Sequence, residues 1–123
     1  MQDGMQDVLA YIDTNRARFV AELAEWVKIP SISSDSTHKP DMVKNAEFLM
    51  ADLRKLGANR VEMWPTKGHP AVFAEWMQSP GKPTLLVYGH HDVQPVDSSH
   101  EGSLNGRLAI SARSAFVSST TLS

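Results

Sequence analysis

The first half of the chain carries the hydrophobic pattern of two amphipathic helices. Across Val8–Val27, apolar residues recur mostly three or four positions apart, with charged residues between them. Pro30 predicts the end of this helix, because its ring excludes the preceding residue from helical geometry. After a polar loop at residues 31–39, a second apolar stripe begins near Pro40, which can occupy a first helical position, and closes at Gly57, a typical left-handed cap.

Three short strands are predicted in the next thirty or so residues. Arg60–Trp64 and Ala71–Met77 are rich in strand formers and flank a turn-rich connection, Pro65–Pro70, which favours a hairpin. The turn Ser79–Lys82 precedes Thr84–Tyr88, which is apolar at successive positions, as expected of a strand covered on both faces. This order predicts an α/β layer arrangement with the last strand most central, covered by the two helices.

Length and composition fit one globular domain. The chain has 123 residues, 41% hydrophobic and 21% charged, which is ordinary for a folded protein. After Asp97 the sequence becomes rich in serine and loses apolar periodicity, so we expect residues 1–97 to form the folded part and residues 98–123 an irregular tail.

Charge and cysteine content exclude several classes of function. Twelve basic and fourteen acidic residues give a formal charge of −2, so no basic field attracts nucleic acid. The absence of cysteine removes disulfides, thiolate nucleophiles and cysteine-ligated zinc, so any metal needs His and carboxylate ligands. The first residues lack the pattern of a secretory signal, and no stretch approaches eighteen apolar residues, which predicts a cytoplasmic location away from membranes.

The segment Gly89–Asp92 carries the candidate chemistry. Side chains alternate along an extended segment, so His90 and Asp92 point one way and His91 the other. His90 is then a candidate metal ligand, with Asp92 placed to accept the second ring N–H and fix the ring direction. The same pair also fits a simple hydrogen-bonded pair or a turn-capping aspartate. Zinc needs at least three protein ligands, and this motif supplies one or two.

The surrounding string resembles a known motif. LLVYGHHDVQPVD, Leu85–Asp97, is similar to the first metal-binding motif of the dinuclear zinc exopeptidases, which include carnosinase-like dipeptidases, glutamate carboxypeptidases, aminoacylases and succinyl-diaminopimelate desuccinylase. The Asp-Val-Gln-Pro ending most resembles the dipeptidase branch. WVKIPSIS at residues 26–33, LRKLGA at residues 53–58 and GHPAVFAEW at residues 68–76 are similar to that family in order and spacing, so the resemblance covers about residues 5–97.

The resemblance implies roles for two residues. His90 matches the family's first zinc ligand, and Asp92 matches the catalytic-site acidic residue that orients it. The family holds two zinc ions that share an aspartate and a water or hydroxide, uses a glutamate as general base, and hydrolyses small peptides or related amides. The implied fold is an incomplete three-layer catalytic domain, with two N-terminal helices packed on a short mixed sheet.

The rest of the family pattern is not recognisable after Asp97. The family continues with a segment for the bridging aspartate, a Glu-Glu pair and further ligands, whereas Phe116, Val117 and Ser118 stand where a carboxylate is required. We therefore expect a truncated metallopeptidase, inactive by itself, produced by a frameshift, an alternative exon or an early stop. Translating the other two reading frames downstream of codon 97 tests this hypothesis.

A second reading belongs to another class of protein. A non-catalytic α/β interaction module would keep the scaffold and associate through the exposed edge of Thr84–Tyr88, an unpartnered apolar strand that can pair with another chain. Self-association or poor solubility of the isolated chain is predicted on either reading. Co-purification with a full-length homologue, without bound zinc, would favour the second.

Other candidate residues receive structural interpretations. His69 lies in a Gly-His-Pro turn, and His38 lies in a polar loop and is expected to be solvated. The three large aromatic residues are expected to pack between helix and sheet: Trp26, Trp64 and Trp76. A hydrolase triad is disfavoured, because its candidates crowd one loop without a strand-to-helix elbow: Ser33, Ser34, Asp35 and His38.

Overall fold

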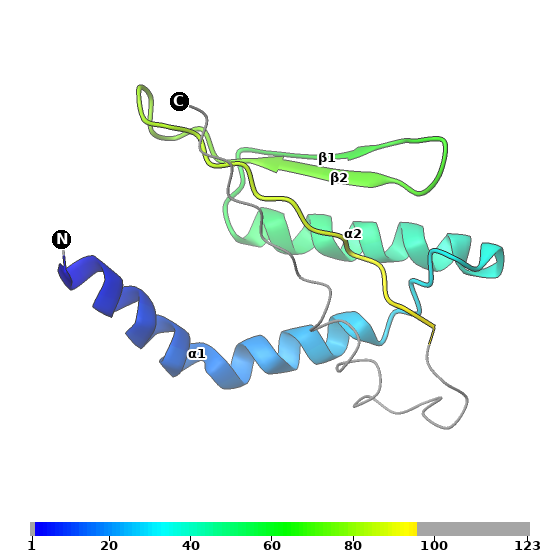
Figure 1. Cartoon of the computed structure of the whole chain (residues 1–123), viewed down its shortest axis with the longest axis horizontal. Coiled ribbons are helices and arrows are strands. Elements are labelled where there is room, and N and C mark those ends of the chain that lie inside the picture. The colour runs from blue at the N-terminus through cyan, green and yellow to red at the C-terminus, as the bar shows by residue number, and fades with distance from the viewer. Residues whose placement is uncertain (1, 96–123) are drawn as a thin grey trace.

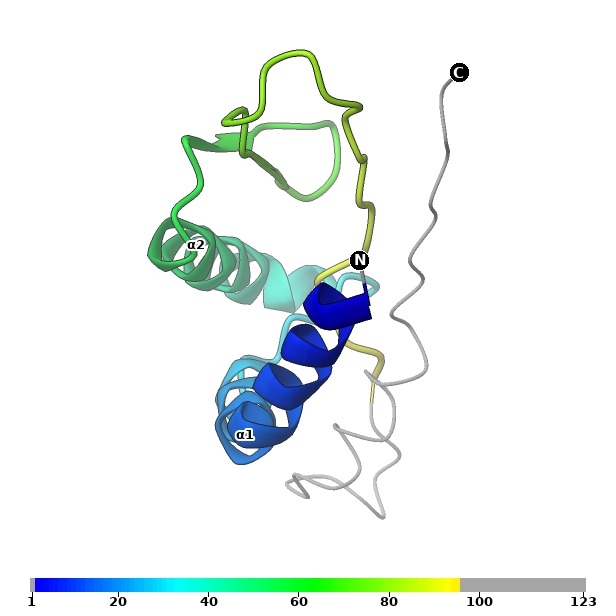
Figure 2. The ribbon, with the colours of Figure 1, turned by 90° about the vertical axis from the view of Figure 1, so that its left-hand side faces the viewer.

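The computed structural model describes residues 2–95, and the predicted tail lies outside these residues. The elements follow the order α1 (Gln2–Val27), η1 (Ser36–His38), α2 (Lys39–Lys55), β1 (Arg60–Trp64) and β2 (Ala71–Glu75). Helix α2 lies along one face of the β1–β2 hairpin, whereas α1 diverges from it (Figures 1 and 2). The α/β class with two helices and a sheet is confirmed.

The first predicted helix is present, but it begins at Gln2, before Val8, and it does not pack on the sheet. Most of its apolar stripe is exposed, including Val8 and Tyr11, and burial begins only in its last turn, where Val27 is 4% exposed. The helix ends as predicted before Pro30, with the amide of Ile29 donating to the Trp26 carbonyl at 3.1 Å. Neither helix within residues 2–95 is long and apolar enough to cross a membrane. The cytoplasmic location stays a prediction.

Helix α2 has the predicted sequence signals at both ends. Pro40 lies in its first turn, where a missing N–H costs nothing. At the other end Gly57 has a φ of +80°, its amide donates to the Arg54 carbonyl at 3.0 Å, and the next amide, of Ala58, donates to the Leu53 carbonyl at 3.2 Å. These two bonds form a Schellman cap, which explains why the helix stops at this glycine.

The predicted hairpin is confirmed, with β1 in the expected range and β2 two residues shorter than expected. The strands are antiparallel, with Arg60 opposite Glu75 and Trp64 opposite Ala71. On one face, the rings of Trp64 and Phe73 stack with centroids 4.6 Å apart. The hairpin loop is closed by Thr66, whose hydroxyl donates to the His69 carbonyl at 2.6 Å.

Two details of the predicted sheet are wrong. Thr84–Tyr88 is not a strand, because it pairs with neither β1 nor β2, and Leu85 to Tyr88 remain 64–70% exposed. The sheet within the described part of the chain is therefore two-stranded and antiparallel, not mixed. The physical reason is that an apolar run specifies a burial environment, whereas a strand also needs a partner backbone for its ladder.

The best-buried side chains come from the end of α1, the following loop, α2 and the segment at Val93. The buried apolar residues are Val27, Ile29, Met42, Ala46 and Val93. Two polar residues are buried among them, Ser31 and Asn45, each 1% exposed. The segment from His90 to Val93 therefore enters the best-packed part of the described chain.

Candidate metal site

Backbone contacts fix the position of the segment that carries the two histidines. After the exposed residues 84–88, the chain passes to the junction of α1 and α2 (Figure 1). There the amide of Val93 donates to the Ser31 carbonyl at 3.0 Å, and the Asn45 side-chain amide donates to the His91 carbonyl. Both partners are buried, so the backbone on either side of Asp92 is held by well-packed groups.

His90 and Asp92 contact each other directly. The Nδ1 of His90 lies 2.6 Å from Oδ1 of Asp92. An ionised carboxylate can only accept, so Nδ1 carries the hydrogen and Nε2 presents its lone pair. This Nε2 makes no hydrogen bond within residues 2–95, and the His90 side chain is 38% exposed. The ring is therefore oriented, with one nitrogen available to a ligand or metal ion from solvent.

The Asp92 carboxylate is held on both oxygens. Its second oxygen, Oδ2, accepts a hydrogen bond from the Ser33 hydroxyl. Partial burial raises the pKa of Asp92, but the hydrogen bonds from Ser33 and His90 outweigh it and leave that pKa below its ordinary value. Asp92 therefore stays ionised at neutral pH and acts as an acceptor toward the imidazole.

His91 points to the opposite side, as alternation predicts, and both of its ring nitrogens are used. Its Nε2 lies 3.3 Å from the Pro70 carbonyl, which can only accept, so Nε2 is the protonated nitrogen. Its Nδ1 then accepts from the Asn45 side-chain amide at 3.0 Å. Neither nitrogen of His91 is free for a metal, so this histidine ties the segment to α2 and to the hairpin loop.

Asn45 was not identified from the sequence as a site residue. Its amide group donates to His91, and its oxygen accepts from the indole Nε1–H of Trp26. Trp26 also stacks on Phe48, with ring centroids 6.2 Å apart, so it packs between the two helices and not between helix and sheet. A signal was available: Asn45 interrupts the apolar face of α2 that contains Met42 and Ala46.

The other two tryptophans also depart from the expectation of burial between helix and sheet. Trp64 and Trp76 are each 44% exposed. The reason is that α1 does not pack on the hairpin, so α2 is the helix that covers it within residues 2–95. Trp64 stacks on Phe73 of the hairpin, and Trp76 Nε1 donates to the Leu56 carbonyl at the end of α2, at 3.2 Å.

The two other histidines within residues 2–95, His69 and His38, have structural partners. His69 lies in the predicted turn, and its Nε2 donates to the Ser33 carbonyl at 2.8 Å. His38 is half-buried and not fully solvated as predicted, because Asp41 in the first turn of α2 reaches back to its Nδ1 at 2.8 Å. The disfavoured hydrolase triad does not assemble within residues 2–95: Ser33 donates to Asp92, Asp35 accepts from Thr37, and His38 contacts Asp41.

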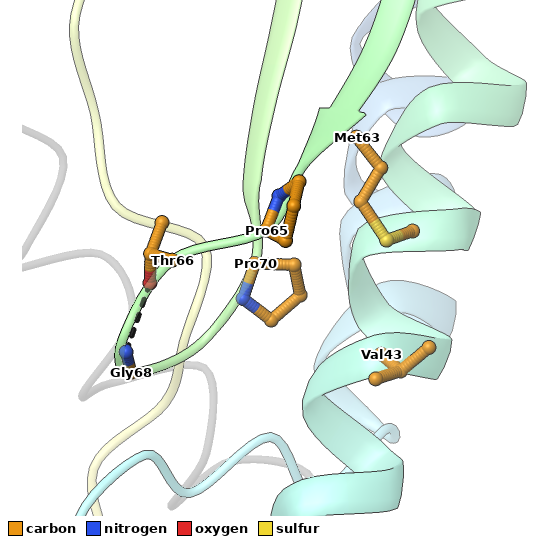
Figure 3. Close-up of a pocket in the computed structure, with 6 residues that line it drawn as sticks. All are labelled: Val43, Met63, Pro65, Thr66, Gly68 and Pro70. Atoms are coloured by element: carbon orange, nitrogen blue, oxygen red, sulfur yellow. Dashed lines mark hydrogen bonds between the residues drawn. The ribbon is translucent and has the colours of Figure 1, made fainter.

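The described residues do not by themselves form a complete metal site. No group of three or more His, Asp or Glu side chains converges within residues 2–95, so His90 is an isolated candidate ligand there. A pocket of about 230 Å³ lies elsewhere, between α2 and the hairpin loop (Figure 3). Its lining offers no ionisable side chain: Val43, Met63, Pro65, Thr66, Gly68 and Pro70. This pocket therefore has no part in metal chemistry.

Comparison with known proteins identifies relatives of one kind. The chain is 33% identical over 106 residues to the Cys-Gly metallodipeptidase dug1 of Schizosaccharomyces pombe, covering 78% of this chain and 22% of that protein. It is 37% identical over 108 residues to the human Beta-Ala-His dipeptidase, covering 76% of this chain and 21% of that protein. No protein-family model matches the chain.

A solved structure agrees with these sequence relatives. The dipeptidase Dug1p from Saccharomyces cerevisiae superposes with a TM-score of 0.69 at 28% identity, covering 77% of this chain and 22% of that one. The chain thus spans about a fifth of the length of the relatives it matches. The names of these relatives describe dipeptidases, and that of the Schizosaccharomyces pombe protein describes a metallodipeptidase.

Proposed function

Because the chain is homologous to the carnosinase-like metallodipeptidases, we propose that residues 2–95 form the part of a dipeptidase-type catalytic domain that contributes one ligand to a zinc site. In this proposal His90 binds the metal through Nε2, and Asp92 fixes its ring. The substrate class is dipeptides or small amides. A zinc ion bound at such a site would lower the pKa of its water and polarise the peptide carbonyl.

One observation carries the proposal: the hydrogen bond to Asp92 already fixes the tautomer and the ring direction that His90 would need to bind a metal ion. Metal-binding imidazoles usually donate their other N–H to a carboxylate or carbonyl, which fixes tautomer and direction. Here the Nδ1–H to Oδ1 contact of 2.6 Å does this, while Nε2 remains without a hydrogen-bond partner in the described part of the chain. His91, by contrast, uses both of its ring nitrogens for contacts with other parts of the chain.

The ligand count limits what these 123 residues do by themselves. Catalytic zinc sites use three protein ligands, and the described part brings together one. We therefore propose that the chain alone does not hydrolyse dipeptides, and that activity requires further ligands. Bound zinc at stoichiometric amount together with dipeptide turnover by the pure chain would overturn this.

Zinc is expected to bind weakly at His90. The measurement is a zinc titration of the chain with ¹⁵N-labelled histidine, followed by the ring resonances. We expect the Nε2 resonance of His90 to move and those of His91 to stay, because both His91 nitrogens are engaged. His90→Asn should abolish the response.

The matched control for that titration is His69→Asn, which removes a histidine that contacts only the Ser33 carbonyl. It should leave the response of His90 in place, although weakened if the Ser33 loop shifts. A zinc response that survives in His90→Asn and is lost in His69→Asn would contradict the assignment of the ligand.

We also propose that Thr84–Tyr88 associates with another copy of the chain. Leu85 to Tyr88 are exposed and have no strand partner within residues 2–95. Such a segment offers unpaired backbone groups and apolar side chains to a second chain. Sedimentation at micromolar concentration should show species larger than the monomer.

A charge in this segment should weaken the association. Leu86→Lys is expected to raise the apparent Kd about tenfold, which corresponds to roughly 1.4 kcal/mol for placing a charge on the apolar surface. Gln78→Lys adds the same charge at an exposed position just before the Ser79–Lys82 turn and should change little. A strictly monomeric parent chain would rule the association out.

A further inference from the structure

We propose that Ser33 is a positioning residue for the metal site, acting through Asp92 on the ring of His90. This inference rests on the proposed function, in which His90 is the ligand. It deepens that function by extending the site to the loop after α1. The hydroxyl of Ser33 donates to the one Asp92 oxygen that His90 does not use.

The need for such a residue follows from the geometry of an aspartate. The torsion that turns its carboxylate plane is broad and roughly two-fold, so a single hydrogen bond to His90 leaves the plane free to rock. In this chain Oδ1 accepts from His90 and Oδ2 from Ser33, and the two donors together define the plane. A fixed plane in turn holds the imidazole in the Nδ1–H tautomer with a set direction for Nε2.

Ser33 itself is held by contacts from two distant parts of the chain. Its carbonyl accepts from His69 Nε2, in the hairpin loop, at 2.8 Å. Two residues earlier, the Ser31 carbonyl accepts from the amide of Val93 at 3.0 Å, and Ser31 is 1% exposed. The loop after α1 is therefore hydrogen-bonded both to the Asp92 carboxylate and to the backbone of the next residue, Val93.

The two histidine rings are fixed by different side chains. His90 is fixed through Asp92 and Ser33, whereas His91 is fixed through Asn45 and the Pro70 carbonyl. Loss of the Ser33 hydroxyl should disturb the tautomer of His90 and leave that of His91 unchanged. A residue that only supported the fold would affect both.

The experiment measures ring tautomers in the metal-free 123-residue chain by ¹⁵N spectra, at a pH well above the ordinary histidine pKa of about 6.5. We expect the unaltered chain to show His90 as Nδ1–H and His91 as Nε2–H. In Ser33→Ala, His90 should become a mixture of both tautomers while His91 keeps Nε2–H. Ser33→Thr retains a hydroxyl and should restore the His90 tautomer.

The matched control is Ser34→Ala, since Ser34 is exposed and its side chain makes no hydrogen bond within residues 2–95. It should leave both histidines unchanged. An unchanged His90 tautomer in Ser33→Ala would overturn the proposal. If Ser33→Ala also loses the His91 tautomer, the substitution has disturbed the fold. The test is then the exchange rate of the Ser33 hydroxyl proton in the unaltered chain. Slow exchange is expected, and rapid exchange would overturn the proposal.

Zinc separates this inference from the proposed function. In Ser33→Ala the apparent zinc affinity of His90 should fall by about tenfold, the lower end of the range for residues that orient a metal ligand. If the His90 tautomer follows Ser33 but zinc does not move the His90 Nε2 resonance, the positioning role stands and the metal proposal fails. If zinc binds His90 equally in both chains with the tautomer unchanged, Ser33 has no positioning role.

Discussion

Replacing Asn45 with leucine is expected to lower the free energy of unfolding by about 3 kcal/mol. Leucine keeps the branched shape of the asparagine side chain, with bulkier methyl groups, but removes every hydrogen bond that Asn45 makes. The indole N–H of Trp26, the Nδ1 of His91 and the His91 carbonyl all lose their partner inside packed structure. A buried polar group without a partner costs about 1–3 kcal/mol, and the half-buried rings recover part of this from water.

Urea unfolding followed by circular dichroism measures this loss, because tryptophan fluorescence would itself respond to the change beside Trp26. The control is Lys44→Leu, one residue earlier on α2 and exposed, which should stay within about 0.5 kcal/mol of the parent. A loss below about 1 kcal/mol in Asn45→Leu would show that the network contributes little to stability. The ring tautomer of His91, read in the same variant, should become mixed.

If zinc binds at His90 as proposed, replacing Asp92 with alanine is expected to weaken that binding about 10–100-fold, the range for removal of a group that orients a metal-binding histidine. Without the carboxylate, the Nδ1–H loses its acceptor at 2.6 Å, and the imidazole rotates and exchanges tautomers freely. The apparent Kd is measured from the shift of the His90 resonances during a zinc titration.

Two further variants sharpen this test. Asp92→Asn keeps an oxygen that can accept from His90 but removes the negative charge, so a smaller loss of zinc affinity is expected. Asp41→Ala removes the acceptor of the other His–Asp pair, between His38 and Asp41 at 2.8 Å, and should leave zinc binding at His90 unchanged. Equal losses in Asp92→Ala and Asp41→Ala would mean that the effect is one of general charge and not of ligand orientation.

The two histidines show why only part of the site was predictable. Alternation along an extended segment is a local property, so it correctly set His90 beside Asp92 and turned His91 away. The partners Ser33 and Asn45 lie 59 and 46 residues away from the side chains they bind. No local pattern encodes such pairings, although a polar residue inside the apolar stripe of α2 was a visible sign for Asn45.

The same distinction between local and distant determinants separates the helices and strands that were predicted correctly from those that were not. The ends of α2 and the β1–β2 hairpin follow from Pro40, Gly57 and a short turn-rich loop, all of which act within a few residues. Thr84–Tyr88 was mistaken for a strand because its apolar residues are visible in the sequence, whereas a ladder partner is not. The prediction that α1 packs on the sheet was wrong for the same reason, because the apolar stripe of the helix does not specify the element against which it packs.

By itself, the sequence determined the local elements, the orientation of His90 relative to Asp92, and the resemblance to zinc exopeptidases, because each depends on residues close together in the chain. Only the tertiary structure decided that the loop after α1 and the buried Asn45 of α2 both form hydrogen bonds with the segment from His90 to Val93. These contacts depend on how distant segments pack, and their strength comes from burial that exists only in the folded chain.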